Sequence, residues 1–307
     1  MNTAIVTGAG PVGRTVATQL ATAGTPVRLL TRSGSGPVHP LIERRSVDVS
    51  DPRAVEEAFT RASAIFHCIH AAYTAEEWRT KLPAAEQVVL DSAAEADAVV
   101  VFPESLYAYG KNLTGPITED TPRTASTGKL GVRTELIKAR LAHRAATVSV
   151  MASDFFGPHV RTAHAGERLI PALLKGERVW VVGSTRQPHS FTYVPDYARA
   201  MIIAATDEAL WGQVVHAPTA PPVTWRELAE LITTVGRAPT PKLSVIPAWL
   251  LHALGLVNTD ARELAETAYQ FTKPFVLDSS EGQRRFGFAP TPLADAIAET
   301  VAWWQAQ

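Results

Sequence analysis

A strand, a glycine-rich turn and a helix follow one another at the start of the chain, and this order restricts the possible folds more than any other feature of the sequence. Residues 4–7 form a short apolar run of strand type that leads directly into a glycine-rich turn at residues 8–13. Val12, Val16 and Leu20 then recur at a spacing of four residues, which places them on one face of a helix. A second apolar run, 27–32, completes a strand–helix–strand unit.

Further strand-like runs alternate with helical segments along the chain. We expect strands at 46–49, 64–69, 98–102 and 147–151, and helices at 51–59, from 75, at 134–145, from 225 and from 292. Strands that alternate with helices form a parallel sheet with helices on both faces. We therefore predict an α/β fold of the Rossmann type, with a doubly wound parallel sheet and a smaller C-terminal substrate lobe.

The glycine turn has the spacing G-x-G-x-x-G of a dinucleotide-binding turn. One glycine allows the tight turn, one lets a pyrophosphate approach the backbone, and one allows close packing of helix on strand. Proline suits the first turn of the helix, where its missing amide is not needed. We predict that the turn residues contact a dinucleotide, namely Gly8, Gly10, Pro11, Val12 and Gly13.

Residues 8–15 also read G-x-x-x-x-G-R-T, which is one substitution away from the phosphate-binding loop of nucleoside triphosphatases. Arg14 stands where that loop requires lysine. The strand expected at 98–102 leads into Pro103 and Glu104 and not into an aspartate suited to magnesium. We therefore favour the dinucleotide turn over a P-loop and over a purely structural glycine turn.

The end of the second strand indicates which dinucleotide is bound. An acidic residue there holds the ribose 2′-hydroxyl of NAD, whereas arginine accommodates the 2′-phosphate of NADP. Here Arg32 and Ser33 follow the strand, and no acidic residue occurs before Glu43. We predict that Arg32 and Ser33 contact NADP (NADPH), with NAD as the alternative cofactor. In the alternative interpretation Arg32 is only a solvated loop cation.

The regular alternation loosens beyond residue 157, where Pro, Gly and His are scattered through 158–190. We expect residues 1–157, completed by about 191–218, to form the NADP-binding Rossmann domain. Residues 158–190 and 219–307 are expected to form mostly the substrate-binding lobe and the C-terminal helices.

Composition limits the partners of the protein. The 29 basic and 30 acidic residues give a net charge of −1 without a basic patch, which argues against nucleic acid. No run approaches the ~20 apolar residues of a membrane span, and no signal peptide precedes the first strand. One cysteine suits a reducing compartment, and His67 and His70 lack further metal ligands nearby. We expect a cytoplasmic monomer or homodimer that binds a small-molecule substrate and no metal, nucleic acid or membrane.

Several motifs together resemble the extended and atypical short-chain dehydrogenase/reductase superfamily, in particular its NAD-dependent epimerase/dehydratase-like group. The resemblance spans nearly the whole chain, through residues 7–13, 48–49, 70–72, 105–110, 154–158, 191–196, 286–287 and 290–292. It implies that Asp48 and Val49 contact the adenine and that His70 and Ala71 belong to a small-residue turn beside the cofactor. It also implies that Phe155 lies near the nicotinamide and that Ser105 orients a substrate oxygen; Ser105 as a turn-stabilising hydroxyl is the alternative.

One part of the family pattern is missing. The family uses a tyrosine to exchange a proton with the substrate oxygen and a lysine one helical turn later. The segment 127–133, where this pair is expected, contains no tyrosine. Tyr107 and Lys111 match the string but follow a strand directly, so we do not expect them to be the pair. We expect Lys129 and Arg133 to lie on a solvated helix surface, and a cation placed near the nicotinamide is their alternative role.

The missing tyrosine bears on the reaction. The chain resembles atypical polyketide ketoreductases, which lack this tyrosine and whose substrates carry an acidic hydroxyl beside the carbonyl that stabilises the developing alkoxide. We expect an NAD(P)H-dependent oxidoreductase that reduces a carbonyl, or oxidises a secondary alcohol, of a small organic substrate, with aromatic polyketides as one candidate. Five aromatic residues are expected either to line its pocket or to lie in the core: Tyr73, Trp78, Phe155, Phe156 and Trp180.

Two other functions remain open at this point. The protein could be a catalytically silent NADP-binding sensor or regulator, because a cofactor site alone does not imply turnover. It could also be a sugar-nucleotide epimerase or dehydratase, although those reactions depend on the tyrosine that is absent here.

Overall fold

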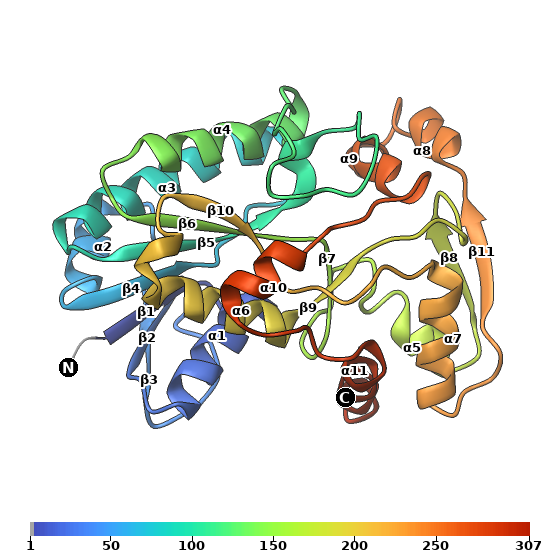
Figure 1. Ribbon diagram of the computed structural model, residues 1–307, viewed down its shortest axis with the longest axis horizontal. Helices are drawn as coiled ribbons and strands as arrows, with labels where there is room; N and C mark the ends of the chain where they lie inside the picture. The colour runs from blue at the N-terminus through green and yellow to red at the C-terminus, as the bar shows by residue number, and fades with distance from the viewer. Residues whose placement is uncertain (1–2) are drawn as a thin grey trace.

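The computed structural model describes residues 3–307, so the first two residues of the predicted 1–157 domain lie outside it. Within these residues, a central sheet of seven strands has the order β10-β6-β5-β4-β1-β2-β3, and every pair of neighbours is parallel (Figure 1). The strands are β1 Thr3–Thr7, β2 Val27–Thr31, β3 Ile42–Ser46, β4 Ala62–His67, β5 Val99–Ser105, β6 Thr147–Ala152 and β10 Gln213–His216. The prediction of a Rossmann-type doubly wound sheet is confirmed.

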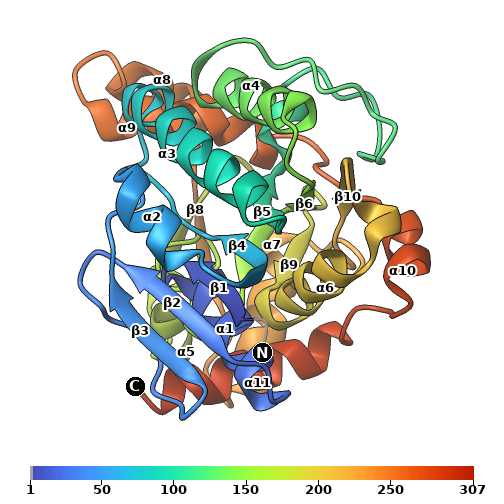
Figure 2. The same cartoon turned by 90° about the vertical axis from the view of Figure 1, so that its left-hand side faces the viewer.

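Helices cover both faces of the sheet, as Figure 2 shows. Helices α1 (Pro11–Thr22) and α6 (Val194–Thr206) pack on one face. Helices α2 (Pro52–Ala58), α3 (Ala75–Glu95) and α4 (Gly128–Ala142) pack on the other. A parallel sheet covered on both sides needs strands that are apolar on both faces, which explains their unbroken apolar runs.

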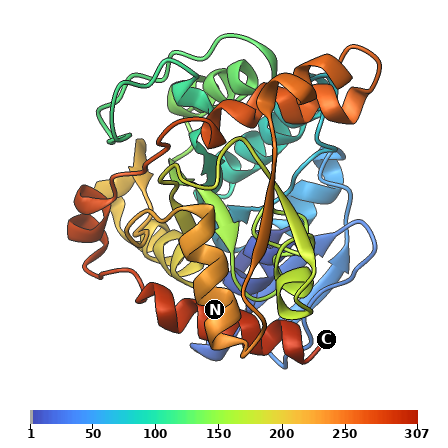
Figure 3. The same cartoon turned by 90° about the vertical axis from the view of Figure 1, so that its right-hand side faces the viewer.

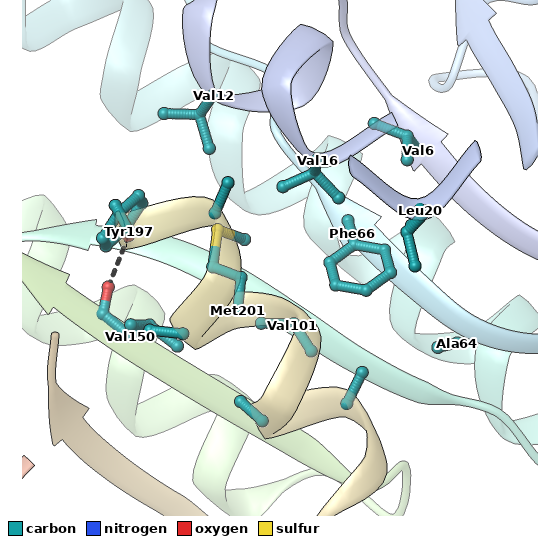
Figure 4. Packing of buried hydrophobic residues seen from close by; sticks show 14 of the residues in the cluster. Val6, Val12, Val16, Leu20, Ala64, Phe66, Val101, Val150, Tyr197 and Met201 are labelled. Atoms are coloured by element: carbon teal, nitrogen blue, oxygen red, sulfur yellow. Dashed lines mark hydrogen bonds between the residues drawn. The ribbon is translucent and has the colours of Figure 1, made fainter. Parts of the chain in front are cut away.

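The alternation of side chains along each strand divides the core into two layers. Val6 and its neighbours Phe66 and Val101 face α1 and α6, where they meet Val16 and Met201 (Figure 4). The residues on the opposite face of the same strands, such as Ile5, Ile65 and Val100, pack under α2 and α3.

Two local predictions need correction. The strand expected at 46–49 lies instead at 42–46, where it forms the edge strand β3, Ile42–Ser46. Its exposed charged residues interrupt the apolar run by which a strand is recognised in the sequence. Helix α4 begins at Gly128 and not at 134. Glycines argue against a helix in the sequence, yet a Cβ at Gly131 would lie 2.5 Å from the Ser126 carbonyl carbon, so the small residue lets the first turn of α4 pack against the preceding loop.

A second lobe follows the sheet and has a hydrophobic core of its own (Figures 1 and 3). Its two parallel strands are β8 (Arg178–Val182) and β11 (Lys242–Ile246). Its helices are α5 (Ile170–Leu174), α7 (Trp225–Val235), α8 (Ala248–Leu254), α9 (Thr259–Thr267) and α11 (Leu293–Gln305), while α10 (Ser280–Phe286) packs against α6 and β10. The short strands β7 (Asp154–Phe156) and β9 (Phe191–Tyr193) pair with each other.

Among the described helices, none has both the length and the apolar character needed to cross a membrane.

A buried ionic cluster ties α3, α4 and β5 together. Arg140 of α4 is 1% exposed, and its guanidinium donates two hydrogen bonds to the Glu86 carboxylate, at 2.6 and 2.7 Å. It also donates to Glu104 of β5 at 2.9 Å. Although burial alone would raise the pKa of Glu86, the charge and hydrogen bonds of Arg140 lower it below its ordinary value. The hydrogen bond from Arg140 therefore holds the Glu104 carboxylate in place at the carboxyl end of β5.

Candidate functional site

The glycine turn between β1 and α1 is built as the sequence predicts. Gly8 has φ +89°, and a Cβ there would lie 2.7 Å from the Cys68 carbonyl oxygen. A Cβ at Gly13 would lie 2.1 Å from the Gly8 carbonyl oxygen, so α1 approaches the turn more closely than any side chain allows. A Cβ at Gly10 would meet nothing within 4 Å.

The turn has room for a dinucleotide beside Gly10, where α1 begins. Gly10 precedes α1 without a side-chain cap, and Pro11 occupies the first helical turn. The first turn of α1 carries no acidic residue. Amide groups at the start of a helix attract anions when no side chain satisfies them, so this backbone offers a place for a pyrophosphate.

A cleft of about 320 Å³ runs from this turn along the carboxyl ends of β4, β5 and β6. In parallel α/β sheets, ligands bind at this edge. Six of the predicted site residues line the cleft: Gly10, Pro11, Val12, His70, Ser105 and Phe155. Tyr73 and Trp78 also line it, whereas Phe156 is buried in the core of the second lobe and Trp180 is 61% exposed on β8.

The remaining predicted cofactor residues lie beyond the cleft. Arg32 and Ser33 are exposed at the end of β2, next to the turn, because β1 and β2 are neighbours. Asp48 is exposed in the loop after β3, and Val49 is buried. Hydrogen bonds from Ser50, together with the charge of Arg32, lower the pKa of Asp48. Ala71 packs against a small core cluster around Trp78.

Ser105 lies in the cleft beside a carboxylate. The Ser105 amide donates to Glu104 Oε1 at 2.8 Å, and the Ser105 Oγ lies 3.4 Å from the same oxygen. Arg133 Nε also lies 3.4 Å from Glu104 Oε1. Glu104, itself held by Arg140, therefore positions both the hydroxyl and the guanidinium at the end of β5.

Arg133 is held in the cleft wall on its other side by His70. Arg133 Nη2 donates to His70 Nε2 at 3.0 Å, while His70 Nδ1 donates to the Ala71 carbonyl at 2.7 Å. Burial and the neighbouring Arg133 lower the pKa of His70 to about 4, so the imidazole stays neutral and its Nε2 accepts a hydrogen bond from Arg133. The guanidinium carbon lies 4.5 Å from the centre of the Trp78 ring.

Lys129 does not reach the cleft. Its side chain is fully buried, and its ammonium contacts the carboxylates of Glu263 and Glu266 on α9, the latter at 2.7 Å. The expectation that Lys129 and Arg133 lie on a solvated helix surface is therefore wrong, because both side chains are at least nine-tenths buried. The sequence could not show this, because the partners of Lys129 lie 134 and 137 residues further along the chain.

Tyr107 lies in the cleft, in the short 3₁₀ turn Leu106–Tyr109 after β5. Its hydroxyl is 2.7 Å from that of Tyr73, which in turn donates to Thr267 Oγ1 at 3.4 Å. Burial raises the pKa of both phenols, and that of Tyr107 lies well above its ordinary value. These phenols therefore stay protonated and are not tuned to release a proton.

A carboxylate–imidazole pair in the cleft wall was not predicted from the sequence. Asp154 Oδ2 accepts a hydrogen bond from His189 Nε2 at 2.7 Å. Asp154 belongs to a motif that carries the family resemblance, but no sequence signal points to His189, which lies 35 residues away. Within residues 3–307, no group of three or more His, Cys, Asp or Glu side chains is arranged to hold a metal ion.

Comparison with known proteins gives a consistent result. The model of the NAD dependent epimerase/dehydratase family matches residues 4–215. A UDP-N-acetyl-alpha-D-glucosaminuronate decarboxylase from Bacillus cytotoxicus is 26% identical over 239 residues, which cover 69% of this chain and 73% of the relative.

Solved structures with similar folds include two further enzymes. The UDP-glucose 4-epimerase from Thermotoga maritima, solved with UDP-glucose, has a TM-score of 0.79 at 18% identity, covering 100% of this chain and 99% of the other. The dTDP-glucose 4,6-dehydratase from Streptomyces venezuelae, solved with NAD, has a TM-score of 0.76 at 18% identity, covering 99% and 97%. None of these three relatives is described as a polyketide reductase.

Proposed function

Because the chain belongs to the NAD dependent epimerase/dehydratase family of the extended short-chain dehydrogenase/reductase superfamily, we propose that it is an NAD(P)-dependent oxidoreductase acting on an oxygen-bearing carbon of a small organic substrate. The observation that carries this proposal is the single cleft that joins the glycine turn to Ser105 and Arg133. In this proposal residues 1–157 with about 191–218 bind the cofactor, and residues 158–190 and 219–307 bind mostly the substrate. Residence in the cytoplasm and a monomeric or homodimeric state are further proposals, consistent with the unpaired Cys68.

The proposed roles follow from the positions of the side chains. A bound nicotinamide would supply or accept the hydride, and Gly8, Gly10, Pro11, Val12 and Gly13 would hold its pyrophosphate. Asp48, Val49, His70, Ala71 and Phe155 are proposed as its further contacts.

Ser105 is proposed to donate a hydrogen bond to the substrate oxygen, and Arg133 to stabilise the negative charge that develops there. Since the pKa values of Tyr73 and Tyr107 are raised, we propose that an acidic hydroxyl of the substrate itself, beside the carbonyl, stabilises the alkoxide. Aromatic polyketides with a hydroxyl next to the carbonyl belong to this substrate class.

A second candidate is a sugar-nucleotide epimerase, dehydratase or decarboxylase. It is favoured by the three relatives, which are described as enzymes of UDP- or dTDP-sugars. The sequence of α4 argues against this candidate, because its first turns lack the tyrosine on which those reactions depend.

Turnover experiments separate these candidates. The protein is incubated with NADPH and a panel of hydroxyquinones, and with NAD and UDP- or dTDP-sugars, while the nicotinamide absorbance is followed. We expect oxidation of NADPH by a hydroxyquinone, whereas turnover of a sugar nucleotide alone would favour the second candidate. Tight NADPH binding with no turnover of either class would favour the sensor.

Replacing Ser105 with alanine is expected to lower kcat/KM by about 100-fold, because one donor to the developing oxyanion is lost. Steady-state kinetics with the substrate found in the panel measures this effect. Ser244→Ala is the matched control, since Ser244 lies on β11 and contacts Arg178 outside the cleft. Unchanged kinetics of Ser105→Ala would contradict this role and would show that the Ser105 hydroxyl only stabilises the turn after β5.

Arg32 is proposed to select NADP. We expect Arg32→Ala to weaken NADPH binding about tenfold or more, because a charge-assisted hydrogen bond to the 2′-phosphate is lost, and to leave NADH binding unchanged. Titration calorimetry with both nucleotides measures this, with Arg79→Ala, an exposed arginine on α3, as control. Equal affinities of the unmodified protein for NADPH and NADH would contradict the proposal.

A further inference from the structure

Asp154 lines the cleft, and its carboxylate is held in place by one side chain. Its Oδ2 is bound by His189 at 2.7 Å, whereas Oδ1 accepts no hydrogen bond from the described residues. His189 is buried, and its ring stacks on Phe271 and Phe275 with centroid distances of 4.6 and 5.5 Å. The imidazole therefore cannot rotate away, and the carboxylate keeps its direction.

The hydrogen bonds of His189 also keep Asp154 ionised. His189 Nδ1 lies 3.2 Å from the Gln270 carbonyl oxygen, so both ring nitrogens are held by neighbouring oxygen atoms. Burial alone would raise the pKa of Asp154, but the hydrogen bond and charge of His189 lower it. A carboxylate in this state accepts hydrogen bonds and has no proton to donate to a phosphate oxygen.

A second polar group in the same wall lacks a protein partner. Ser153 lines the cleft directly before Asp154, is 7% exposed, and its hydroxyl is buried without a hydrogen bond. An unpaired buried hydroxyl costs stability unless a ligand or water satisfies it. Ser153 and Asp154 together offer a donor and an acceptor at one place, which suits a hydroxyl group of a ligand.

The cleft offers a substrate phosphate no unpaired cation among the described residues that line it. Of these residues only Arg133 is an arginine or lysine, and it already faces the carboxylate of Glu104, which Arg140 also binds. The neutral His70 adds no positive charge. Proteins bind diphosphates with arginines or helix N-termini, and the start of α1 is assigned to the dinucleotide.

We propose that Asp154 and Ser153 select the substrate by holding a hydroxyl of an uncharged, hydroxylated ring compound, and that Asp154 disfavours nucleoside diphosphate sugars. The rings of Tyr73, Trp78, Tyr107 and Phe275, which line the same cleft, supply flat apolar walls for such a compound. This inference rests on the proposed oxidoreductase function and names its substrate class.

The test compares three probes at pH 6 on protein saturated with NADP⁺: 2,6-dihydroxyanthraquinone, whose hydroxyls are neutral and have no internal hydrogen bond to the carbonyl, unsubstituted anthraquinone and UDP-glucose. We expect the dihydroxy compound to bind at least about tenfold more tightly than anthraquinone, because it gains a hydrogen bond to a charged acceptor. UDP-glucose is expected to bind most weakly. Tighter binding of UDP-glucose, or equal binding of both anthraquinones, would overturn the inference.

Variants locate the effect. Asp154→Ala and Ser153→Ala are each expected to reduce the preference for the dihydroxy compound about tenfold while leaving anthraquinone affinity unchanged. Ser153→Ala leaves the pair of Asp154 and His189 intact, so it tests the site even if Asp154→Ala folds poorly. Asp120→Asn, an exposed loop residue, is the control. An unchanged preference in Ser153→Ala and in folded Asp154→Ala would also overturn the inference.

NADPH binding is measured first, so that the two proposals fail separately. Absence of NADPH binding would contradict the proposed function itself. Normal NADPH binding combined with no preference for the hydroxylated probe would contradict only the selection by Asp154 and Ser153.

Discussion

Gly13→Ala is expected to lower the affinity for NADPH about 100-fold. The added Cβ would lie 2.1 Å from the Gly8 carbonyl oxygen, a backbone atom that cannot move independently of the turn. Overpacking of this kind costs about 1–3 kcal/mol, so α1 must shift away from β1 and carry its N-terminus away from the pyrophosphate. Fluorescence titration with NADPH and urea unfolding measure the two effects.

Two other glycine variants serve as comparisons for Gly13→Ala. A Cβ at Gly10 or at Gly115 would meet nothing within 4 Å, so neither alanine should disturb the fold. Gly115→Ala should bind NADPH normally. Gly10→Ala should keep its stability and still bind NADPH more weakly, because its methyl group occupies the side from which a pyrophosphate approaches. Normal NADPH binding by Gly13→Ala would refute the assignment of this turn.

Arg140→Met is expected to lower the free energy of unfolding by about 3–5 kcal/mol, the usual cost of leaving buried charges without their partner. The change would leave the carboxylates of Glu86 and Glu104, which are 5% and 3% exposed, without the guanidinium that binds both. Urea unfolding at neutral pH measures the loss. Arg144→Met is the matched control, because the Arg144 side chain is 61% exposed in its pair with Glu95 and should contribute less than about 1 kcal/mol.

The pH dependence of the Arg140 variant gives an independent check. In the unmodified protein the pKa of Glu86 is lowered, so its contribution to stability is present at neutral pH and is lost as the pH falls through that pKa. Without Arg140, burial raises the pKa of Glu86, and protonation relieves the buried charge. The difference in stability between the two proteins should therefore shrink as the pH falls from 7 towards about 4. A constant difference would contradict this account of the cluster.

The sequence could predict those features that depend on neighbouring residues. The glycine turn and the apolar runs of β1, β2, β4, β5 and β6 each involve residues a few positions apart, and all are present in the structure. Ser105 was predicted from the resemblance of residues 105–110 to the family.

Features that depend on packing between distant segments could not be predicted. The partner of Lys129 lies 134 residues further along the chain, and that of Asp154 lies 35 residues away. Arg133 was considered only as a cation, because its contact with Glu104 exists only once α4 packs beside β5. The charge balance of the cleft, and with it the substrate class proposed above, follows from these long-range contacts.

The burial of Lys129 against Glu263 and Glu266 limits how the two lobes move. A swing of α9 away from α4 would separate the Lys129 ammonium from the carboxylates of Glu263 and Glu266 and hydrate all three groups. Hydration offsets part of the lost attraction, so the ionic contact resists this opening by less than the cost of leaving a charge buried alone. We therefore expect ligands to exchange through the rest of the cleft rim while α4 and α9 stay in contact.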